Sequence, residues 1–573
     1  MKRVGAAVAS LVVFVFPLLG ATQGARATAP SAQASVFLIH GASFEEMMSV
    51  PEFRKLAAAG GAALLSHDAV AGRYLASAAG GSSGAGITVV DLGTAPVGPE
   101  AARAAFLDRA GRQVYATLAQ VASGGQTGQA LVVAVGRSPG MLAERDELGT
   151  LIYAPAGATG ATGPMDTLTS DSTRRAGVVV GEDLLPTLAS AGVSVGAAAD
   201  SGSVIKIVDA PPPLGLHRRY LEHRRLTVPI GAAAGIYVTL VGLLGVVVLV
   251  GRAKAPGWLR SLSAYLAISV VSLAVALLEV GRLPTLSYGA VVPFLAGVTA
   301  AGTLALVPLV RRRGALEALF WLGLGVLVVL AVEAATGWPA AITPLLGGSQ
   351  LDGGRFFGMP NVEIGLVLGA ALFVARGLRS RVAGTVLLIA CGLVAGLPWT
   401  GSNLGASVTL FAAAGFWWGL RGGRGWLWTA GTAAGTVIVG LALVLAAHRF
   451  LPGAPTHITR FTEASGGLGG MAGKVVDRLA VGLRLIGADP FAIIPVLGVP
   501  VLLFAVMSPA APVRVTFDAH PEWRAAVLSI LLASVVAYLA NDSGAAALGL
   551  GFGTALGGLL YVSLLASRGM MEP

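Results

Sequence analysis

Three short polar clusters interrupt the hydrophobic part of this 573-residue sequence. They contain carboxylates, carboxamides, hydroxyls and a guanidinium, which can bind polar ligands or transfer protons, and such groups are costly near lipid and tend to be functional when they gather there. We expect a ligand site in which Glu363 and Asp542 are the candidate catalytic acids. The candidate ligand-binding residues of the clusters are Asp352, Arg355, Asn361, Glu363, Ser402, Asn403, Asn541, Asp542 and Ser543.

A purely structural interpretation of the clusters is also open. Each cluster precedes an apolar segment, so Asn361, Asn403 and Asp542 with their neighbours would cap helix N-termini, and Glu363 would favour the dipole of a first helical turn. Capping alone and capping combined with a shared ligand site remain equal alternatives at this point. Three helix N-termini on one surface would favour the shared site, because their free N–H groups bind anions.

The composition is that of a multi-pass membrane protein. Hydrophobic residues make up 55% and charged residues 12% of the chain, and the mean hydropathy is +0.77, as in packed membrane helices. The formal net charge is +10, but the arginines lie mostly in short connections between apolar segments. Membrane topology therefore explains the charge, and no nucleic-acid partner is expected. The single cysteine, Cys391, provides neither a disulfide framework nor a thiolate metal site.

The sequence predicts eleven membrane spans after Pro229, each near the ~20 residues that cross the hydrocarbon core. Arginines concentrate in the connections on one side, so the positive-inside rule places that side and the C-terminus in the cytoplasm, and the polar clusters on the outer face. The predicted spans are 229–251, 260–281, 288–310, 315–335, 361–376, 382–398, 404–420, 425–447, 490–507, 524–540 and 544–566.

The N-terminal part is expected outside the cytoplasm. A signal peptide is predicted at 1–27, because Lys2 and Arg3 are followed by an apolar run and by a cleavage signal at 25–27. An uncleaved anchor helix is the alternative, and it would also place residues 30–225 outside the cytoplasm. There, short β-rich runs alternate with helical patterns, which predicts an α/β domain with a mainly parallel sheet. The predicted strands are 36–39, 87–92, 131–135 and 204–208, and the predicted helices are 52–59 and 101–121.

Two basic segments of the outer side extend the list of expected partners. The stretch 217–225 (HRRYLEHRR) is expected to contact anionic lipid headgroups, with docking of an anionic envelope polymer as the alternative. Within the transmembrane domain at 226–573, the outer loop 448–489 places apolar residues on one helical face, which predicts an amphipathic helix on the membrane surface. Membrane lipid and an anionic envelope polymer or lipid-linked ligand are therefore the expected partners.

The stretches 36–44 and 51–60 resemble the opening of alkaline-phosphatase and sulfatase-like domains, which begin with a strand, an Asp-Gly pair and a P-x-L-x-x-L-A-x-x-G helix. The segment 168–188 is similar to the C-terminal part of such domains. The segments 354–358, 401–403 and 541–544 are similar to those of a largely uncharacterised family of actinobacterial membrane proteins that carry this domain. The resemblance implies an alkaline-phosphatase-like α/β fold in front of an all-α membrane bundle.

The chain departs from that pattern at the metal site. His40 stands where catalytic members of the superfamily place a metal-binding aspartate, and the later D-x-H and D-H-G segments are absent. The resemblance therefore implies a relative that does not hydrolyse phosphoesters, with no cofactor expected. For a single metal, His40, His67 and Asp68 are the remaining candidates, and a surface histidine and a helix start are the alternative interpretation.

These patterns predict a plasma-membrane protein that binds or organises a cell-envelope component at the outer face and favour a protein that is not an enzyme. Arg174, Arg175 and Arg355 would bind phosphate or carboxylate groups through paired hydrogen bonds. The first alternative is a transferase or ligase that acts on a lipid-linked substrate, with Glu363 or Asp542 as general base. The second is a transporter, which the scarcity of ionisable residues near the span centres disfavours.

Overall fold

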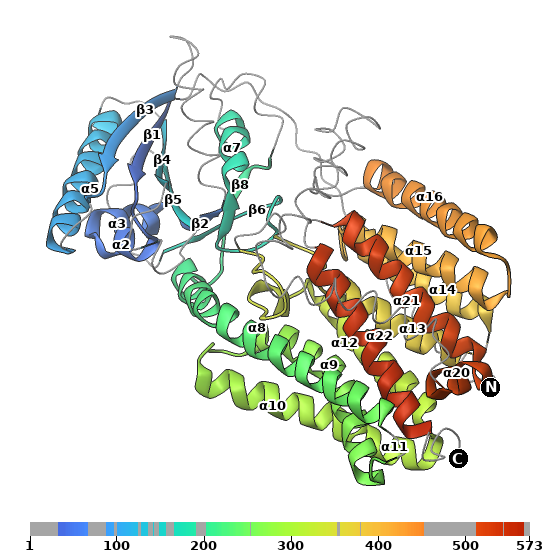
Figure 1. Ribbon diagram of the computed structural model, residues 1–573. Helices are drawn as coiled ribbons and strands as arrows, with labels where there is room; N and C mark the ends of the chain where they lie inside the picture. Colours follow the sequence, from blue (N-terminus) through green and yellow to red (C-terminus); the bar gives the residue numbers. More distant parts are fainter. Residues whose placement is uncertain are drawn as a thin grey trace.

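The computed structural model places an α/β domain beside a bundle of apolar helices (Figure 1). The predicted signal peptide, the predicted span at 490–507 and most of the outer loop lie outside the described residues, so these features stay predictions. The structure describes residues 33–66, 87–96, 100–123, 128–135, 141, 148–155, 165–190, 202–251, 254–351, 356–378, 380–451, 511–541 and 544–566.

One sheet forms the centre of the α/β domain, in the order β3-β1-β4-β5-β2-β6-β8, with β7 beside β2. The central strand β1 runs parallel to β3 and β4, whereas β5 runs antiparallel to both of its neighbours and β8 antiparallel to β6. The sheet is therefore mixed, with β5 and β8 opposed to the other six strands, and the prediction of a mainly parallel sheet is confirmed. The strands are β1 (Gln33–His40), β2 (Ala62–Ser66), β3 (Ile87–Thr94), β4 (Gly128–Val135), β5 (Gly149–Pro155), β6 (Thr167–Ser170), β7 (Val178–Val180) and β8 (Ile205–Val208).

Helices cover both faces of this sheet. On one face, α2 (Phe44–Ser49), α3 (Pro51–Ala59) and α5 (Glu100–Ser123) bury an apolar cluster with the strands, and α7 (Leu184–Ser190) packs on the opposite face. Helix α2 begins with a capping box between Ser43 and Glu46, and α3 begins with Pro51, whose fixed φ suits a first helical position. The four predicted strands and two predicted helices correspond to β1, β3, β4, β8, α3 and α5.

Seven helices of the described residues are long and apolar enough to cross a membrane, namely α8, α9, α10 with α11, α12, α16, α21 and α22. The structure thus contains a helical region compatible with a multi-pass membrane protein; the number eleven stays a prediction. The helices are α8 (Pro213–Val250), α9 (Gly257–Glu279), α10 (Tyr288–Leu304), α11 (Leu306–Arg313), α12 (Ala315–Thr336), α13 (Ile364–Gly377), α14 (Arg381–Gly396), α15 (Leu404–Arg421), α16 (Trp426–Phe450), α20 (Ala511–Ala519), α21 (Pro521–Ala540) and α22 (Gly544–Ala566).

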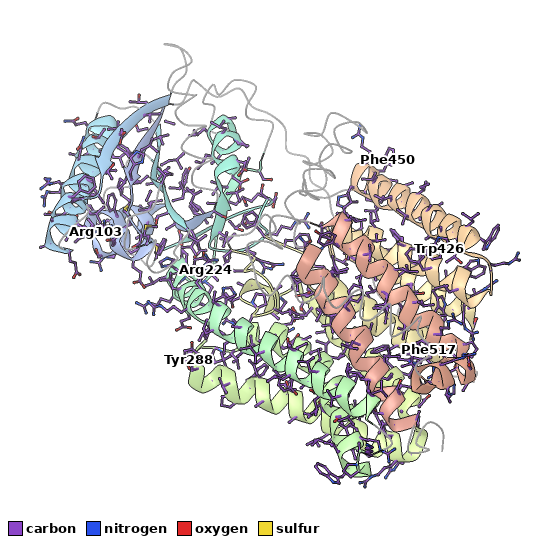
Figure 2. The ribbon with its side chains drawn as sticks, in the orientation of Figure 1. Arg103, Arg224, Tyr288, Trp426, Phe450 and Phe517 are labelled. Carbon is purple, nitrogen blue, oxygen red and sulfur yellow. The ribbon has the colours of Figure 1, made fainter. Side chains whose placement is uncertain are left out.

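Glycines set the closest helix contacts of the bundle. A Cβ on Gly557 would lie 2.7 Å from the Ala267 carbonyl of α9, so this glycine of α22 belongs to a packing face. At Gly431 and Gly435 of α16, an added Cβ would meet no atom of the described residues within 4 Å. Helix α16, whose ends Trp426 and Phe450 are labelled in Figure 2, instead exposes much of its surface.

Candidate functional site

The connection between α12 and α13 joins the bundle to the α/β domain. Its residues Leu351 and Phe356 are buried in the apolar cluster that also holds Phe44 and Phe53 of the domain. Tyr220, near the start of α8, belongs to the same cluster. The two parts of the protein therefore share one core at this junction, and the polar clusters must be considered together with the domain above them.

Arg174 and Arg175 lie in the turn between β6 and β7 and reach from the domain to the bundle. Arg174 adopts a φ of 52°, donates a hydrogen bond to the Pro398 carbonyl at 2.8 Å and stacks on the ring of Phe357. Arg175 donates from Nε to the Phe356 carbonyl at 2.6 Å and from Nη2 to the Gln350 side chain. Both arginines thus fasten the domain to the bundle, and their predicted role in ligand binding stays a prediction.

Burial lowers the pKa of Arg175 to about 10, although the carboxylate of Glu333 favours the charged form. The guanidinium is therefore still charged at neutral pH and brings a positive charge into the junction. Its contacts explain why it tolerates burial, because charge-assisted hydrogen bonds to several carbonyl groups replace water.

Replacing Arg175 with Ala should loosen the junction. We expect a loss of about 1.5–3 kcal/mol of docking free energy, because hydrogen bonds from a charged donor would be lost and buried carbonyls left without it. Hydrogen–deuterium exchange of residues 337–351 measures the effect. Arg112→Ala is the control: this exposed arginine pairs with Asp108 on α5, and surface ion pairs contribute less than about 1 kcal/mol. Unchanged exchange in Arg175→Ala would refute the docking role.

Two of the three polar clusters meet at the junction. The Nδ2 of Asn403 donates to the Met359 carbonyl at 2.9 Å and to the Asn361 Oδ1 at 3.1 Å, and the Met359 N–H donates to the Gly401 carbonyl at 2.9 Å. Ser402, in the same turn, is buried with a φ of 46° and donates to the Pro398 carbonyl at 3.3 Å. The loops before α13 and α15 therefore form one hydrogen-bonded unit.

The third cluster joins through its first residue. A Cβ on Gly405 would lie 2.1 Å from the Asn541 Oδ1, so the start of α15 is in close contact with the end of α21. The Nδ2 of Asn541 donates to the Ala537 carbonyl at 2.9 Å. Asp542 and Ser543 lie outside the described residues, as do Asp352 and Arg355 of the first cluster. For the residues that are described, the sequence clusters converge.

The capping predictions have mixed outcomes. Asn403 caps α15, since its Oδ1 accepts from the Ala406 N–H at 2.9 Å, as predicted. Asn361 does not cap α13, because this helix begins at Ile364 and Glu363 occupies the N-cap position without a side-chain cap bond. The physical reason is that the chain from Asn361 to Glu363 forms a tight turn, in which the Ile364 N–H donates to the Asn361 carbonyl at 3.4 Å.

An ion network of the membrane helices lies beside these loops. Glu333 of α12 is fully buried and accepts from Arg282 and, at 3.1 Å, from the Ala340 N–H. The Nε of Arg282 also contacts the Oε2 of Glu279 at 2.8 Å. One arginine thus serves two carboxylates.

Glu363 differs from the other acids of the junction. Its side chain is 0% exposed, and neither of its oxygens has a hydrogen-bond partner among the described residues. The carboxylates of Glu333 and Glu279 lie within electrostatic range. A buried carboxylate without a partner is unfavourable unless a proton or a ligand donor compensates it. Glu363 is therefore the residue of this junction best suited to receive a hydrogen-bond donor or a cation.

Sequence reasoning missed the junction contacts of the basic stretch. Arg219 donates to Gly281 and Thr343, and the ring Nε2 of His223 lies 2.6 Å from the Pro344 carbonyl. Arg218 forms an exposed ion pair with Glu45. Arg219 and His223 therefore contact protein, and the expected headgroup contact of the stretch stays a prediction. Their spacing of four along a helix was the available signal, since it places both side chains on one face.

A contact between His40 and Asp91 and a structural arginine lie around the end of β1. His40 Nε2 lies 3.5 Å from the Asp91 Oδ1, and among the described residues no group of three metal-binding side chains occurs. Arg103, labelled in Figure 2, donates to the Gly41 carbonyl and to Glu46. Burial raises the pKa of Glu46, but hydrogen bonds from Arg103 and the Ser43 N–H outweigh burial and hold it below its usual value. His67 and Asp68 lie outside the described residues.

Comparisons with protein-family models, with curated proteins and with solved structures find no match for this chain.

Proposed function

We propose that the protein binds a hydroxyl- or amine-bearing cell-envelope component at the junction of its α/β domain and its membrane bundle. The domain would lie outside the cytoplasm and resemble a phosphatase domain that has lost its metal ligands. The bound group would donate hydrogen bonds to Glu363, while Asn361, Asn541 and neighbouring helix N-termini supply further polar contacts.

The single observation that carries this proposal is the fully buried Glu363 carboxylate without a partner among the described residues. It lies where two sequence-distant loops are hydrogen-bonded together and a third polar segment packs against them. Buried polar groups are normally hydrogen-bonded, and an exception calls for a bound partner or a functional role. A ligand donor satisfies that requirement.

The proposed orientation is supported by the arginines at the end of the bundle away from the domain. Guanidinium groups stack there on tryptophan rings, an arrangement suited to the membrane interface, and arginines concentrate on the cytoplasmic side of membrane proteins. The stacked pairs are Arg313 with Trp321, Arg381 with Trp418, Arg421 with Trp417, and Arg424 with Trp428.

A transferase that acts on a lipid-linked substrate is the second candidate. The same Glu363 favours it, because a carboxylate without a hydrogen-bond partner among the described residues can accept a proton from a substrate hydroxyl or amine as a general base. The two functions differ in outcome: a binding protein returns its ligand unchanged, and a transferase forms a new product.

The test uses the full chain, reconstituted in nanodiscs and incubated with a total lipid and glycan extract of the cell envelope. Mass spectrometry identifies what co-purifies with the wild-type protein and with Glu363→Gln. We expect a component that is retained by the wild type and lost at least about tenfold in the variant, since a hydrogen bond to a charged group contributes about 1.5–3 kcal/mol.

Glu317→Gln is the matched control, because this acid lies near the start of α12, at the other end of the bundle, and is exposed. Retention by this variant with loss in Glu363→Gln supports the proposal. Equal retention by both variants would refute a role for Glu363. A component that is chemically altered by the wild type and unaltered by Glu363→Gln would favour the transferase.

A further inference from the structure

An apolar cavity of about 300 Å³ opens between α9, α10, α11 and α12. Its lining includes Ser272 of α9, Gly302 of α10 and Gly325 of α12. Only 11% of the most apolar part of the span Tyr288–Arg313 is buried among the described residues. An apolar helix that the rest of the bundle leaves uncovered is expected to face the bilayer, which would make membrane lipid the neighbour of this cavity.

A break between α10 and α11 creates the space. Pro308 has no N–H to donate to the Leu304 carbonyl, and its ring disfavours the preceding helical turn, so α10 ends at Leu304 and α11 begins at Leu306. The side of the break is lined by the small residues Gly302 and Ala305, and a Cβ on Gly325 would meet no atom within 4 Å. The cavity is thus open at α12 as well.

One polar side chain lies in this apolar lining. Ser272 is 5% exposed, and its Oγ has no hydrogen-bond partner among the described residues. The Oγ lies against Gly302, where an added Cβ would be 2.7 Å away, so this hydroxyl belongs to the packed wall of the cavity. The lining is therefore suited to an acyl chain, and polar recognition must come from the rim of the cavity.

Positive charge lies next to the cavity. Trp321 lines it, and the guanidinium of Arg313 stacks on the Trp321 ring, 5.7 Å from its centre. Arg311 and Arg312 precede Arg313 at the end of α11, and all three arginines are exposed. Glu317 pairs with Arg313, so this group of four side chains keeps a net positive charge. A tryptophan and arginines at a helix end are typical of the membrane interface, where phosphate groups of lipids lie.

We propose that this cavity binds an anionic phospholipid of the leaflet away from the α/β domain. One acyl chain enters the cavity between α10 and α12, and the phosphate lies at Arg313 and its two neighbours. The volume of the cavity suits part of a single chain, so the rest of the lipid stays in the bilayer. This site is separate from the junction and does not depend on the function proposed there.

The experiment uses the full chain in phosphatidylcholine nanodiscs that contain a small amount of a lipid probe with a photoreactive acyl chain. The headgroup of the probe is either phosphatidylglycerol or phosphatidylcholine. After illumination, peptide mass spectrometry locates the crosslinks. With the phosphatidylglycerol probe, we expect crosslinks in residues 298–309 and 321–329. The phosphatidylcholine probe should give fewer crosslinks there, by a factor of about five for each arginine that contacts the headgroup, because a basic residue near the surface contributes about 1 kcal/mol with anionic lipid.

Two variants test the binding of the acyl chain and the binding of the headgroup separately. Gly325→Leu places a side chain in the cavity, where an added Cβ meets no atom of the described residues within 4 Å, and should abolish the crosslinks. Gly431→Leu, at a glycine of α16 with equal space for a Cβ, should not change them. Arg313→Gln should reduce the preference for phosphatidylglycerol about fivefold. Its control is Arg424→Gln, which removes a guanidinium that stacks on Trp428 in the same way.

Undiminished crosslinks in Gly325→Leu would overturn the proposal, and so would equal labelling by the two probes in the wild type. A third outcome would also overturn it: if neither probe labels the cavity and Gly325→Leu changes the oligomeric state, a second copy of the chain is the occupant.

Discussion

Replacing Glu363 with Met should stabilise the protein by roughly 1–3 kcal/mol, although it removes the residue on which the proposed function depends. The wild-type carboxylate is fully buried without a hydrogen-bond partner among the described residues, and a buried polar atom in that state costs about 1–3 kcal/mol. Met has a similar length and leaves no unsatisfied atom. Unfolding of the full chain in mixed micelles, followed by tryptophan fluorescence, measures the difference.

Glu333→Met is the matched control, because Glu333 is equally buried but fully used. Its carboxylate accepts from the Ala340 N–H and from Arg282, so the same substitution leaves the buried Ala340 N–H without this acceptor and leaves Arg282 with Glu279. We expect a loss of about 1–3 kcal/mol, the cost of a buried donor that loses its acceptor. If Glu363→Met also destabilises the protein, Glu363 has a structural partner and is not held for a ligand.

Gly358→Ala should cause the largest loss of stability at the junction, about 3 kcal/mol or more. Gly358 has a φ of 88°, a region that L-residues adopt at a cost of roughly 1–2 kcal/mol. Its Cβ would also lie 2.0 Å from the Gly401 carbonyl oxygen. Because the obstacle is backbone, the two loops must separate, and overpacking of this kind costs about 1–3 kcal/mol in addition.

The yield of folded protein and its thermal unfolding measure this effect. Gly348→Ala, in the same connection, is the control, because an added Cβ there would meet no atom within 4 Å. We expect the control to unfold as the wild type does. A Gly358→Ala protein with wild-type stability would show that the loops before α13 and α15 are not held together as the structure has them.

The sequence was informative where residue types favour one kind of element over a whole segment. Strand β1 and helix α5 could be predicted, because β1 contains the run VFLI and the pattern of α5 is local. Strand β2 could not, since its sequence AALLS lacks β-branched and aromatic residues and all five residues are buried, which leaves no alternation to detect. The antiparallel pairing of β5 depends on which strands become neighbours, and that information is not local.

The candidate site divides in a similar way. Asn403 could be predicted as a cap, because the residues that it caps follow it directly in the chain. The contact between Asn403 and Asn361 joins residues 42 positions apart, and the sequence indicates only that both lie at helix starts. Arg175 and its partner Gln350 are 175 positions apart in the sequence, so the sequence does not reveal this contact. Arg174 and Arg175 suggest a ligand site in the sequence, but in the fold both bind protein groups.

Helix α8 has a mechanical consequence for the whole molecule. It runs without a break for 38 residues, which at 1.5 Å per residue is roughly 57 Å, and it begins in the core of the α/β domain, where Tyr220 is buried (Figure 1). A continuous helix transmits torsion instead of absorbing it. The domain therefore cannot turn about the bundle without rotating its first membrane helix, unless α8 bends at Pro229, the proline within this helix.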